Sequence, residues 1–310
     1  MKAAGLAVSG ESSFWREQFL ESVTENTMGE KIPKVAFQGE RGAFSEDAAR
    51  QLLGVDVGTI PCRTFEEMFE AVATGAADAA AAPIENSLAG SVHKNYDLLM
   101  EHDLTIIGET NVRIVHHLIT QRGAALKDVR RVHSHPVALA QCEKFLRANR
   151  QIEVVPAYDT AGSVKMIVES GSLQDAAIAG VTAAAVYDAA IIVESIEDNP
   201  KNFTRFLLLT RPERADSFKT IAGLDERKTS IVFRVANKPG ALFRSIAAFA
   251  LRDIDLTKIE SRPIEGRPWE YSFYVDLIGD QHEPRVERAL ANLAELAESV
   301  RVLGSYPRSS

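Results

Sequence analysis

The chain has 310 residues, of which 45% are hydrophobic and 25% are charged, and its formal net charge is −8. This composition is typical of a soluble globular protein with room for two or three domains. The acidic balance argues against a nucleic-acid-binding surface, which needs clustered basic residues. No apolar run reaches the roughly 20 residues that span a bilayer, so we expect no membrane partner.

The cysteines and the N-terminus indicate the compartment. Cys62 and Cys142 are the only cysteines, and with no metal-ligand spacing between them both are interpreted as buried thiols in a reducing compartment. Residues 1–33 lack the charged-then-apolar order of a signal peptide, and their glutamates argue against an organelle transit peptide. We therefore expect a cytoplasmic protein, with 1–33 as an N-terminal extension of no assigned function.

Residues 34–212 alternate between strand-like and helix-like patterns. The apolar segment Lys34–Gln38 predicts a strand, and the next helix is expected to begin at Ser45, a suitable N-cap followed by acids in the first turn. Further helices are predicted at 64–75, 91–101, 136–148, 160–170 and 181–188. Further strands are predicted at 77–82, 104–119, 152–157, 175–179 and 190–194. The alternation predicts an α/β fold with mainly parallel sheets in two lobes.

A polar segment, 213–227, is the expected linker to a second region at 228–310. Its strand-like segments are 229–235, 255–261, 269–277 and 300–306, and its helix-like segments are 239–252 and 284–297. The order βαββαβ is that of a ferredoxin-like fold. Because a fold does not identify a function, the function has to be argued from the residues of the sites.

Four strand-to-helix turns of the first region carry glycines, hydroxyls and amides. In chain order they hold Gly39, Gly42 and Ser45; Glu85, Asn86 and Ser87; Ser134, His135 and Gln141; and Thr160. Each turn alone is explained by helix capping, and the first lacks the spacing of a nucleotide-binding motif. No third ligand accompanies the histidine pair at 133 and 135, so we expect no metal site. Together the turns predict a cleft, lined by helix N-termini and hydroxyls, that binds an anion.

A hydroxyl and a guanidinium stand side by side at Thr204 and Arg205, where the apolar run from Phe206 begins. Arginine can bind a carboxylate through two parallel hydrogen bonds. A threonine hydroxyl can donate a hydrogen bond to a leaving hydroxyl group. The alternative is an ordinary exposed start of a strand, which would leave both residues without a chemical role.

Taken in sequence, these segments resemble the motifs of prephenate dehydratases. The matching segments are Gly39–Ser45, Pro83–Val92, Ser134–Gln141, Tyr158–Ser163, Ala176–Tyr187 and Asn202–Phe206. Residues 228–310 resemble an ACT regulatory domain, with Asn237–Leu242 at the first strand-to-helix turn and Glu260–Pro263 after the second strand. The resemblance covers roughly 34 to 306. Gly180 departs from it, since the family commonly has serine there.

The resemblance implies a catalytic domain of two lobes, similar to a periplasmic binding protein, at approximately 34–112 with 204–212 and at 113–203. The substrate would lie between the lobes, and the ACT domains would pair side by side in a homodimer or homotetramer. The implied reaction is the decarboxylating dehydration of prephenate to phenylpyruvate in L-phenylalanine biosynthesis. It would be feedback-regulated by L-phenylalanine and would need no metal or other cofactor.

The resemblance also implies roles for individual residues. Thr204 would be most closely tied to activity, and the other catalytic residues would be Arg205, Ser87, Asn86, Glu85 and Thr160. The substrate cleft would be completed by Gly39, Gly42, Ser45, Ser134, His135, Gln141 and Phe206. The effector would bind to Asn237, Pro239, Gly240, Ala241 and Leu242 of the turn and to Glu260, Ser261 and Arg262 of the strand.

Three other functions are open at this point. An arogenate dehydratase performs the same elimination on a substrate with an amine in place of the side-chain ketone, and the sequence does not separate the two. A non-catalytic amino-acid-binding sensor is disfavoured by the presence of Thr204 and Arg205. A solute-binding protein would share the two-lobed fold but would need a secretion signal and would have no use for an ACT domain.

Overall fold

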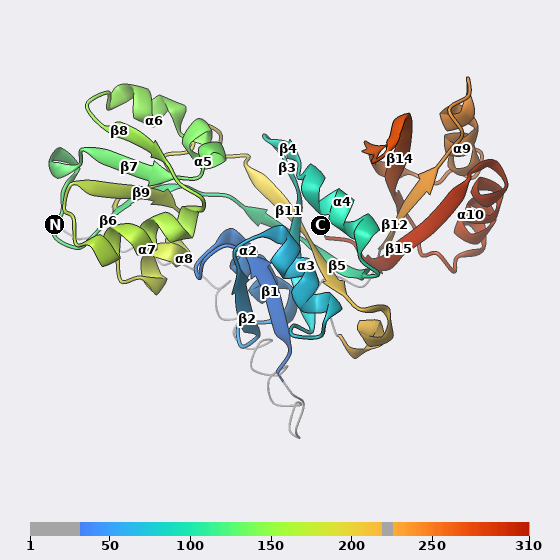
Figure 1. Ribbon diagram of the computed structural model, residues 1–310, viewed down its shortest axis with the longest axis horizontal. Coiled ribbons are helices and arrows are strands. Elements are labelled where there is room, and N and C mark those ends of the chain that lie inside the picture. Colours follow the sequence, from blue (N-terminus) through green and yellow to red (C-terminus); the bar gives the residue numbers. More distant parts are fainter. Residues whose placement is uncertain (1–31, 219–225, 310) are drawn as a thin grey trace, which may run out of the picture. The chain divides into compact units, whose positions relative to one another are not determined.

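The computed structural model describes residues 32–218 and 226–309. The expected extension, 1–33, therefore lies almost wholly outside the described residues, as does part of the expected linker. Residues 33–310 form one compact unit, which contains three sheets (Figure 1). We refer to the parts built around these sheets as lobe one, lobe two and the C-terminal domain.

Lobe one contains a sheet of strand order β2-β1-β3-β11-β5, with β4 paired to β3. Alternate residues of β3 and β11 enter two different apolar clusters: Ala80 and Leu207 lie in one, and Ala81 and Leu208 in the other. Both sheet faces are therefore buried, which explains why these strands are apolar throughout. The elements are β1 (Lys34–Gln38), α2 (Phe44–Leu53), β2 (Gly58–Cys62), α3 (Phe65–Ala73), β3 (Ala79–Asn86), β4 (Gly90–Ser91), α4 (His93–Glu101), β5 (Thr105–Arg113) and β11 (Phe203–Thr210).

Lobe two contains a sheet of order β10-β6-β9-β7-β8 (Figure 1, green). The chain enters it through residues 114–116, after β5, and leaves it through 194–202, before β11. Its elements are β6 (His117–Thr120), η1 (Leu126–Asp128), β7 (Arg131–Ser134), α5 (Pro136–Gln141), α6 (Glu143–Ala148), β8 (Glu153–Pro156), α7 (Thr160–Ser170), β9 (Asp175–Ala179), α8 (Val181–Val186) and β10 (Ala190–Val193).

The predicted α/β fold in two lobes is confirmed, with four local corrections and with three strands, β2, β4 and β7, that were not predicted. The predicted strand 104–119 is two strands in different sheets, because the chain crosses between the lobes at 114–116, where neither glycine nor proline marks a break. The sheets are mixed, since β11 returns from lobe two antiparallel to both of its neighbours. The predicted helix 136–148 is interrupted at Cys142. Helix α2 begins one residue before Ser45, with Ala43 in the N-cap position.

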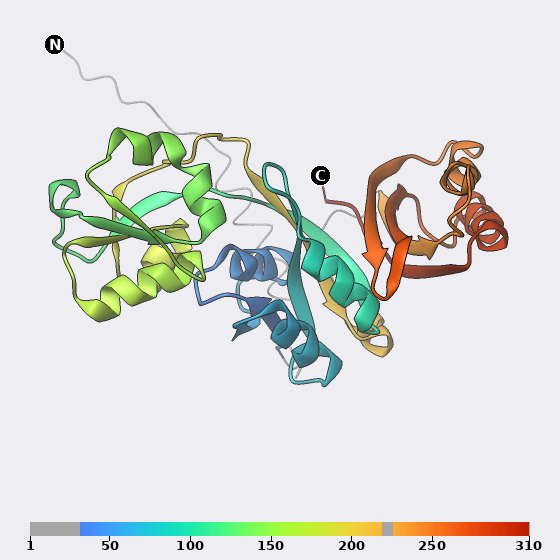
Figure 2. The same ribbon diagram turned by 45° about the horizontal axis from the view of Figure 1, so that its top comes forward.

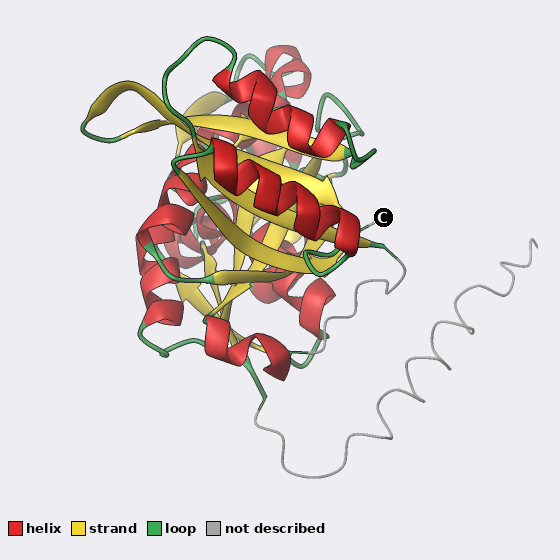
Figure 3. Ribbon diagram, turned by 90° about the vertical axis from the view of Figure 1, so that its right-hand side faces the viewer, coloured by secondary structure: helices red, strands yellow, loops and turns green. Residues whose placement is uncertain are grey.

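The C-terminal domain is an antiparallel sheet of order β13-β14-β12-β15 with two helices, which confirms the predicted βαββαβ fold. Figures 2 and 3 show both helices on the same side of this sheet, and their apolar residues form a core with its inner face. The other face contributes Val232, Tyr274, Leu303 and Tyr306 to a cluster shared with lobe one. The elements of this domain are β12 (Arg227–Arg234), α9 (Ala241–Ala250), β13 (Leu256–Ile264), β14 (Arg267–Ile278), α10 (Pro284–Leu296) and β15 (Ser299–Pro307). The short helix η2 (Pro212–Ser217) follows β11 and packs against β5 of lobe one.

Within the described ranges, no helix has both the length and the apolar character needed to cross a membrane.

Candidate active site

The strand pair β3–β11 presents two chemically different faces. In its register Asn86 lies opposite Thr204, and Glu85 lies opposite Arg205. Because successive side chains of a strand point to opposite sides, Asn86 and Thr204 share one face and Glu85 and Arg205 share the other. We call these the front face and the back face of the strand pair. The front face is neutral and the back face is charged.

On the front face, the amide of Asn86 has a fixed orientation. Its Oδ1 atom accepts hydrogen bonds from the backbone N–H groups of Leu88 (3.0 Å) and Ala89 (2.8 Å). Its Nδ2 atom therefore faces the other way and donates to Thr204 Oγ1 at 2.9 Å. Because Thr204 accepts this hydrogen bond, its own hydroxyl proton is free to be donated elsewhere.

A chain of amides continues this network to lobe two. Asn86 Nδ2 also donates to Asn202 Oδ1 (2.8 Å), and Asn202 Nδ2 donates to Gln141 Oε1 (2.9 Å). Gln141 belongs to α5, and its Oε1 atom is 3.0 Å from His116 Nε2. An amide oxygen can only accept, so this pattern assigns the proton to His116 Nε2. The predicted residues Asn86, Gln141 and Thr204 are thus brought together between the lobes.

Two residues of this network were missed in the sequence. Asn202 is fully buried, and His116 is only 2% exposed. Burial lowers the pKa of His116, which favours the neutral ring. Asn202 begins the segment Asn202–Phe206 that resembles the family motif, which was a usable signal, whereas nothing in the local pattern marked His116.

Ser87 uses its hydroxyl within the protein. Its Oγ atom donates to the carbonyl of Lys201 (3.1 Å) and accepts from the N–H of Phe203 (3.0 Å). Both groups belong to the segment that leads into β11. Ser87 therefore holds this segment in place beside Asn86, and its hydroxyl already has a donor and an acceptor partner.

A second cluster joins the Gly39–Ser45 turn to lobe two. Asp159, the N-cap of α7, accepts through Oδ2 from the N–H groups of Gly162 (2.8 Å) and Glu40 (3.2 Å). Gly42 has a φ of +85°, and a Cβ atom there would lie 2.6 Å from Ala183 Cα, so only glycine allows this close approach. The turn thus meets lobe two at the start of α7, where Thr160 is the first helical residue.

Four predicted cleft residues have other roles in the structure. Ser134 is fully buried and donates to the carbonyl of Ile178 at 2.6 Å. Phe206, 2% exposed, lies in the core of lobe one. Ser45 is buried in the first turn of α2, and His135 accepts through Nδ1 from Val137 N–H as the N-cap of α5. The prediction that Ser134 and Phe206 line a cleft is therefore corrected, since both are interior residues.

On the back face, Arg205 is occupied by acidic and hydroxyl groups of the protein. Its Nε atom donates to Glu109 at 2.6 Å, its Nη1 to Asp276 at 2.5 Å and its Nη2 to the hydroxyl of Tyr306 at 3.1 Å. Burial alone would lower the pKa of Arg205, but the charge of Asp276, with further contributions from Tyr306 and Glu109, holds it above its usual range. This placement argues against the predicted role of Arg205 in binding a substrate carboxylate.

Glu85 shares this face and has a cationic partner. Its Oε1 atom accepts from Lys258 Nζ of the C-terminal domain at 2.8 Å. The predicted catalytic residues are therefore divided by the strand pair. Asn86 and Thr204 lie on the side that is linked to lobe two, and Glu85 and Arg205 lie on the side that contacts the C-terminal domain.

Comparison with known proteins identifies the family. Residues 35–214 match the family model for prephenate dehydratase, and residues 229–295 match that for the ACT domain. The chain belongs to the prephenate dehydratase family. Of its relatives, the Arabidopsis thaliana protein named arogenate dehydratase/prephenate dehydratase 2, chloroplastic, is 43% identical over 296 residues, which are 92% of this chain and 75% of the relative.

Two solved structures are similar over most of the chain. The prephenate dehydratase of Arthrobacter aurescens, in complex with L-Phe, is 35% identical with a TM-score of 0.79 and covers 89% of this chain and 90% of its own. A protein called GqqA and described as a novel type of quorum quenching acylase is 36% identical, also with a TM-score of 0.79, over 89% and 98%. The C-terminal domain is therefore an ACT domain attached to a prephenate dehydratase catalytic domain.

The predicted effector residues of the ACT domain lie in two settings. Gly240 has a φ of +76° and occupies the N-cap position of α9, at the turn that also holds Asn237, Pro239, Ala241 and Leu242. Glu260 and Arg262, by contrast, contact lobe one. Glu260 accepts from Ser91 Oγ at 2.5 Å, and Arg262 forms two hydrogen bonds with Asp97, at 2.8 and 3.0 Å. Ser261 lies between them on an exposed position of β13.

Proposed function

We propose that this prephenate dehydratase family member converts prephenate into phenylpyruvate, carbon dioxide and water. In this reaction the bond from the ring to its carboxylate breaks, and its electron pair enters the ring. The bond from the ring to its hydroxyl group breaks at the same time, and the hydroxyl leaves as water after taking up a proton. Because the ring becomes aromatic, the enzyme mainly has to orient the dianion and assist the departure of the hydroxyl.

The observation that carries this proposal is the direction of the Thr204 hydroxyl. Asn86 donates to Thr204 Oγ1 at 2.9 Å, and the amide of Asn86 cannot turn because two backbone N–H groups hold its oxygen. The proton of Thr204 is therefore available to a leaving hydroxyl group. A fixed donor aimed at developing negative charge is a strong source of catalysis.

The same geometry disfavours an acylase like the one described for GqqA. A threonine that attacks an acyl carbon must lose its proton to an adjacent base. In the described part of the chain, the polar side chain that contacts Thr204 is the amide of Asn86, which donates to it. The imidazole of His116 hydrogen-bonds to Gln141, and the amides of Gln141, Asn202 and Asn86 separate it from Thr204. We therefore assign dehydration rather than acyl transfer.

We further propose prephenate rather than arogenate as the preferred substrate, L-phenylalanine as an inhibitor that binds to the ACT domain, and a cytoplasmic homo-oligomer as the working form. The similarity to the Arthrobacter aurescens enzyme with L-Phe supports the first two statements, and the buried free thiols of Cys62 and Cys142 agree with a reducing compartment. Arogenate dehydratase is the alternative, supported by the names of the plant relatives.

Steady-state turnover of prephenate and of arogenate, each as the sole substrate, tests the proposal. We expect a higher kcat/KM with prephenate, and a decrease of its rate with added L-phenylalanine. Turnover of arogenate alone would transfer the assignment to the alternative. Turnover of neither compound would refute a catalytic function and leave the amino-acid sensor.

A further inference from the structure

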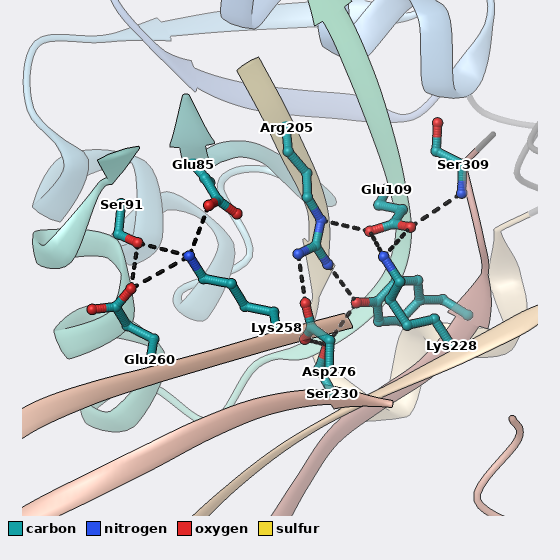
Figure 4. A network of polar contacts seen from close by, with 11 residues as sticks. Glu85, Ser91, Glu109, Arg205, Lys228, Ser230, Lys258, Glu260, Asp276 and Ser309 are labelled. Atoms are coloured by element: carbon teal, nitrogen blue, oxygen red, sulfur yellow. Dashed lines mark hydrogen bonds and ion pairs between the residues drawn. The ribbon is translucent and has the colours of Figure 1, made fainter. Parts of the chain in front are cut away.

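The back face of the strand pair is held by ionic contacts with the ACT domain at two places, drawn in Figure 4. We call them the Arg205 cluster and the Lys258 cluster. The Arg205 cluster contains Arg205, Glu109, Asp276 and Lys228, and the Lys258 cluster contains Lys258, Glu85, Ser91 and Glu260. Each cluster joins residues of lobe one to residues of the ACT sheet.

The Arg205 cluster is a largely buried network in which positive and negative side chains alternate. Lys228 Nζ lies 2.7 Å from the carboxylate of Glu109. The guanidinium of Arg205 donates both to this carboxylate and to that of Asp276. The exposed fractions of these four side chains lie between 2% and 13%. Ser230 and Tyr306 supply further hydroxyl partners. Such buried pairs contribute little net stability, since desolvation offsets their attraction, but they strongly constrain geometry because an unpaired member would be costly.

The Lys258 cluster surrounds a single ammonium group. Lys258 Nζ is 2.8 Å from Glu85, 2.9 Å from Ser91 Oγ and 3.4 Å from Glu260. Ser91 belongs to β4 and lies opposite Glu85 in the β3–β4 register. The ammonium group therefore binds two neighbouring strands of lobe one at once, next to Asn86.

The anchored residues are the chain neighbours of the front-face pair. Glu85 directly precedes Asn86, and Arg205 directly follows Thr204. The hydrogen bond between Asn86 and Thr204 is 2.9 Å long, and hydrogen bonds weaken steeply when donor and acceptor separate or lose alignment. A displacement of either strand on its back face would therefore change the direction of the Thr204 proton on its front face.

We propose that Lys258 and Asp276 of the ACT domain are positioning residues for the dehydration, because they hold the strand pair in the arrangement that aligns Asn86 with Thr204. The inference rests on the proposed function. It means that the ACT domain contributes directly to the geometry of the catalytic strands, beyond any ligand that it binds. A misplacement of about 1 Å at a catalytic group can cost roughly 100-fold in rate.

Four variants of the full chain, assayed with prephenate, test this inference. Lys258→Met removes the ammonium group from a side chain that is 15% exposed, and Lys258→Arg retains a cation. Asp97→Asn is the matched control. It weakens the ion pair with Arg262, which also joins the ACT domain to lobe one but through α4 rather than through the strand pair.

We expect Lys258→Met to lower kcat about tenfold with KM changed less than about twofold, the signature of a group that acts on the transition state. Lys258→Arg should recover most of the loss, and Asp97→Asn should keep kcat within about twofold. Asp276→Asn, which retains the size of the side chain, should lower kcat at least as much as Lys258→Met. If Asp276→Asn fails to fold, Lys258→Met decides the matter.

Three results would overturn the inference: a folded Lys258→Met protein with the kcat of the Asp97→Asn control, a Lys258→Met protein that changes only KM, or one that is unfolded by circular dichroism. The wild type is assayed in the same series. A wild type inactive on prephenate would refute the proposed function, whereas an active wild type with unaffected variants would refute the positioning role alone.

Discussion

Neighbouring residues of β3 and β11 lie on opposite faces of the strand pair, and the two faces differ in charge and in the parts of the protein that they contact. The front face carries Asn86 and Thr204, neutral groups whose hydrogen bonds lead into lobe two. The back face carries Glu85 and Arg205, charged groups whose partners belong largely to the ACT domain. A neutral front face suits a site that receives a dianion, because it adds no repelling carboxylate. The charged back face gives rigidity without entering the chemistry.

The largest effect is expected at Thr204. Thr204→Ala removes the donor on the front face and should lower kcat by about 10²- to 10³-fold, the usual cost of losing one aligned donor to a developing negative charge. Thr204→Ser retains the hydroxyl and should keep much of the activity. Stopped assays on both proteins, with melting curves as a control of folding, provide the measurement. A Thr204→Ala enzyme within about threefold of wild type, a loss of only ~0.65 kcal/mol of barrier, would contradict the assignment.

Asn86→Asp sharpens the comparison by replacing the amide NH2 of the front face with a carboxylate oxygen, which removes the donor and adds a negative charge. The carboxylate can still accept from Leu88 and Ala89, but it cannot donate to Thr204 as Asn86 Nδ2 does. Thr204 would then donate its own proton to the carboxylate, and we expect kcat to fall about 100-fold. The same kinetic assay measures it. If the variant turns over prephenate at the wild-type rate, the orientation of the Thr204 proton is not what matters.

Gly240→Val tests the ACT domain away from the strand pair. The φ of +76° at Gly240 is unfavourable for a β-branched residue, so the turn before α9 should be distorted. We expect inhibition by L-phenylalanine to be lost. Inhibition is measured as the rate of each protein relative to its own rate without L-phenylalanine, and binding of L-phenylalanine is measured by calorimetric titration. Lys238→Gln, an exposed change in the same turn, serves as the control. Unchanged inhibition in Gly240→Val would move the effector site elsewhere.

The smallest effect is a pH dependence of stability at the edge of the front-face network. Burial lowers the pKa of His116 in the folded protein, with the hydrogen bond to Gln141 and the charge of Glu197 opposing the shift and His117 reinforcing it. The folded state is therefore favoured above the unfolded pKa of about 6.5 and loses stability as pH falls below it. Melting temperatures between pH 8 and pH 5 should fall less steeply in His116→Gln than in wild type. The exposed His282→Gln should behave like wild type. Equal slopes in all three proteins would show that His116 does not carry this effect.

The sequence predicted most of the elements, though not the strands β2, β4 and β7, and it did not predict the sides on which their residues lie. Segments 160–170 and 175–179 were predicted with the observed bounds, since a capped helix and a buried strand have strong local patterns. Thr204 and Arg205 were assigned to one site because both belong to the segment that resembles the family motif, although alternation along a strand places adjacent side chains on opposite faces. The partners of Arg205 could not be read from the sequence, because Asp276 is 71 residues away and belongs to another domain.

The prediction of buried cleft residues failed for a related reason. Ser134 and Phe206 belong to segments that match the family, but a matching segment contains core positions as well as site positions. The contacts of each residue separate the two kinds, since Ser134 bonds within its own sheet, whereas the equally buried Asn202 bonds to Asn86 and Gln141. The strand prediction at 104–119 shows a similar limit, since neither glycine nor proline marks the crossing at 114–116.

Kinetics of Arg205→Lys test the division between the two faces most directly. A lysine keeps the charge but not the planar fork that joins Glu109, Asp276 and Tyr306. We predict a lower melting temperature and a reduced kcat, with KM for prephenate within about twofold of wild type, because the guanidinium does not contact the substrate. A KM raised about tenfold or more at an unchanged melting temperature would contradict the account, since it would mean that Arg205 binds a substrate carboxylate after all.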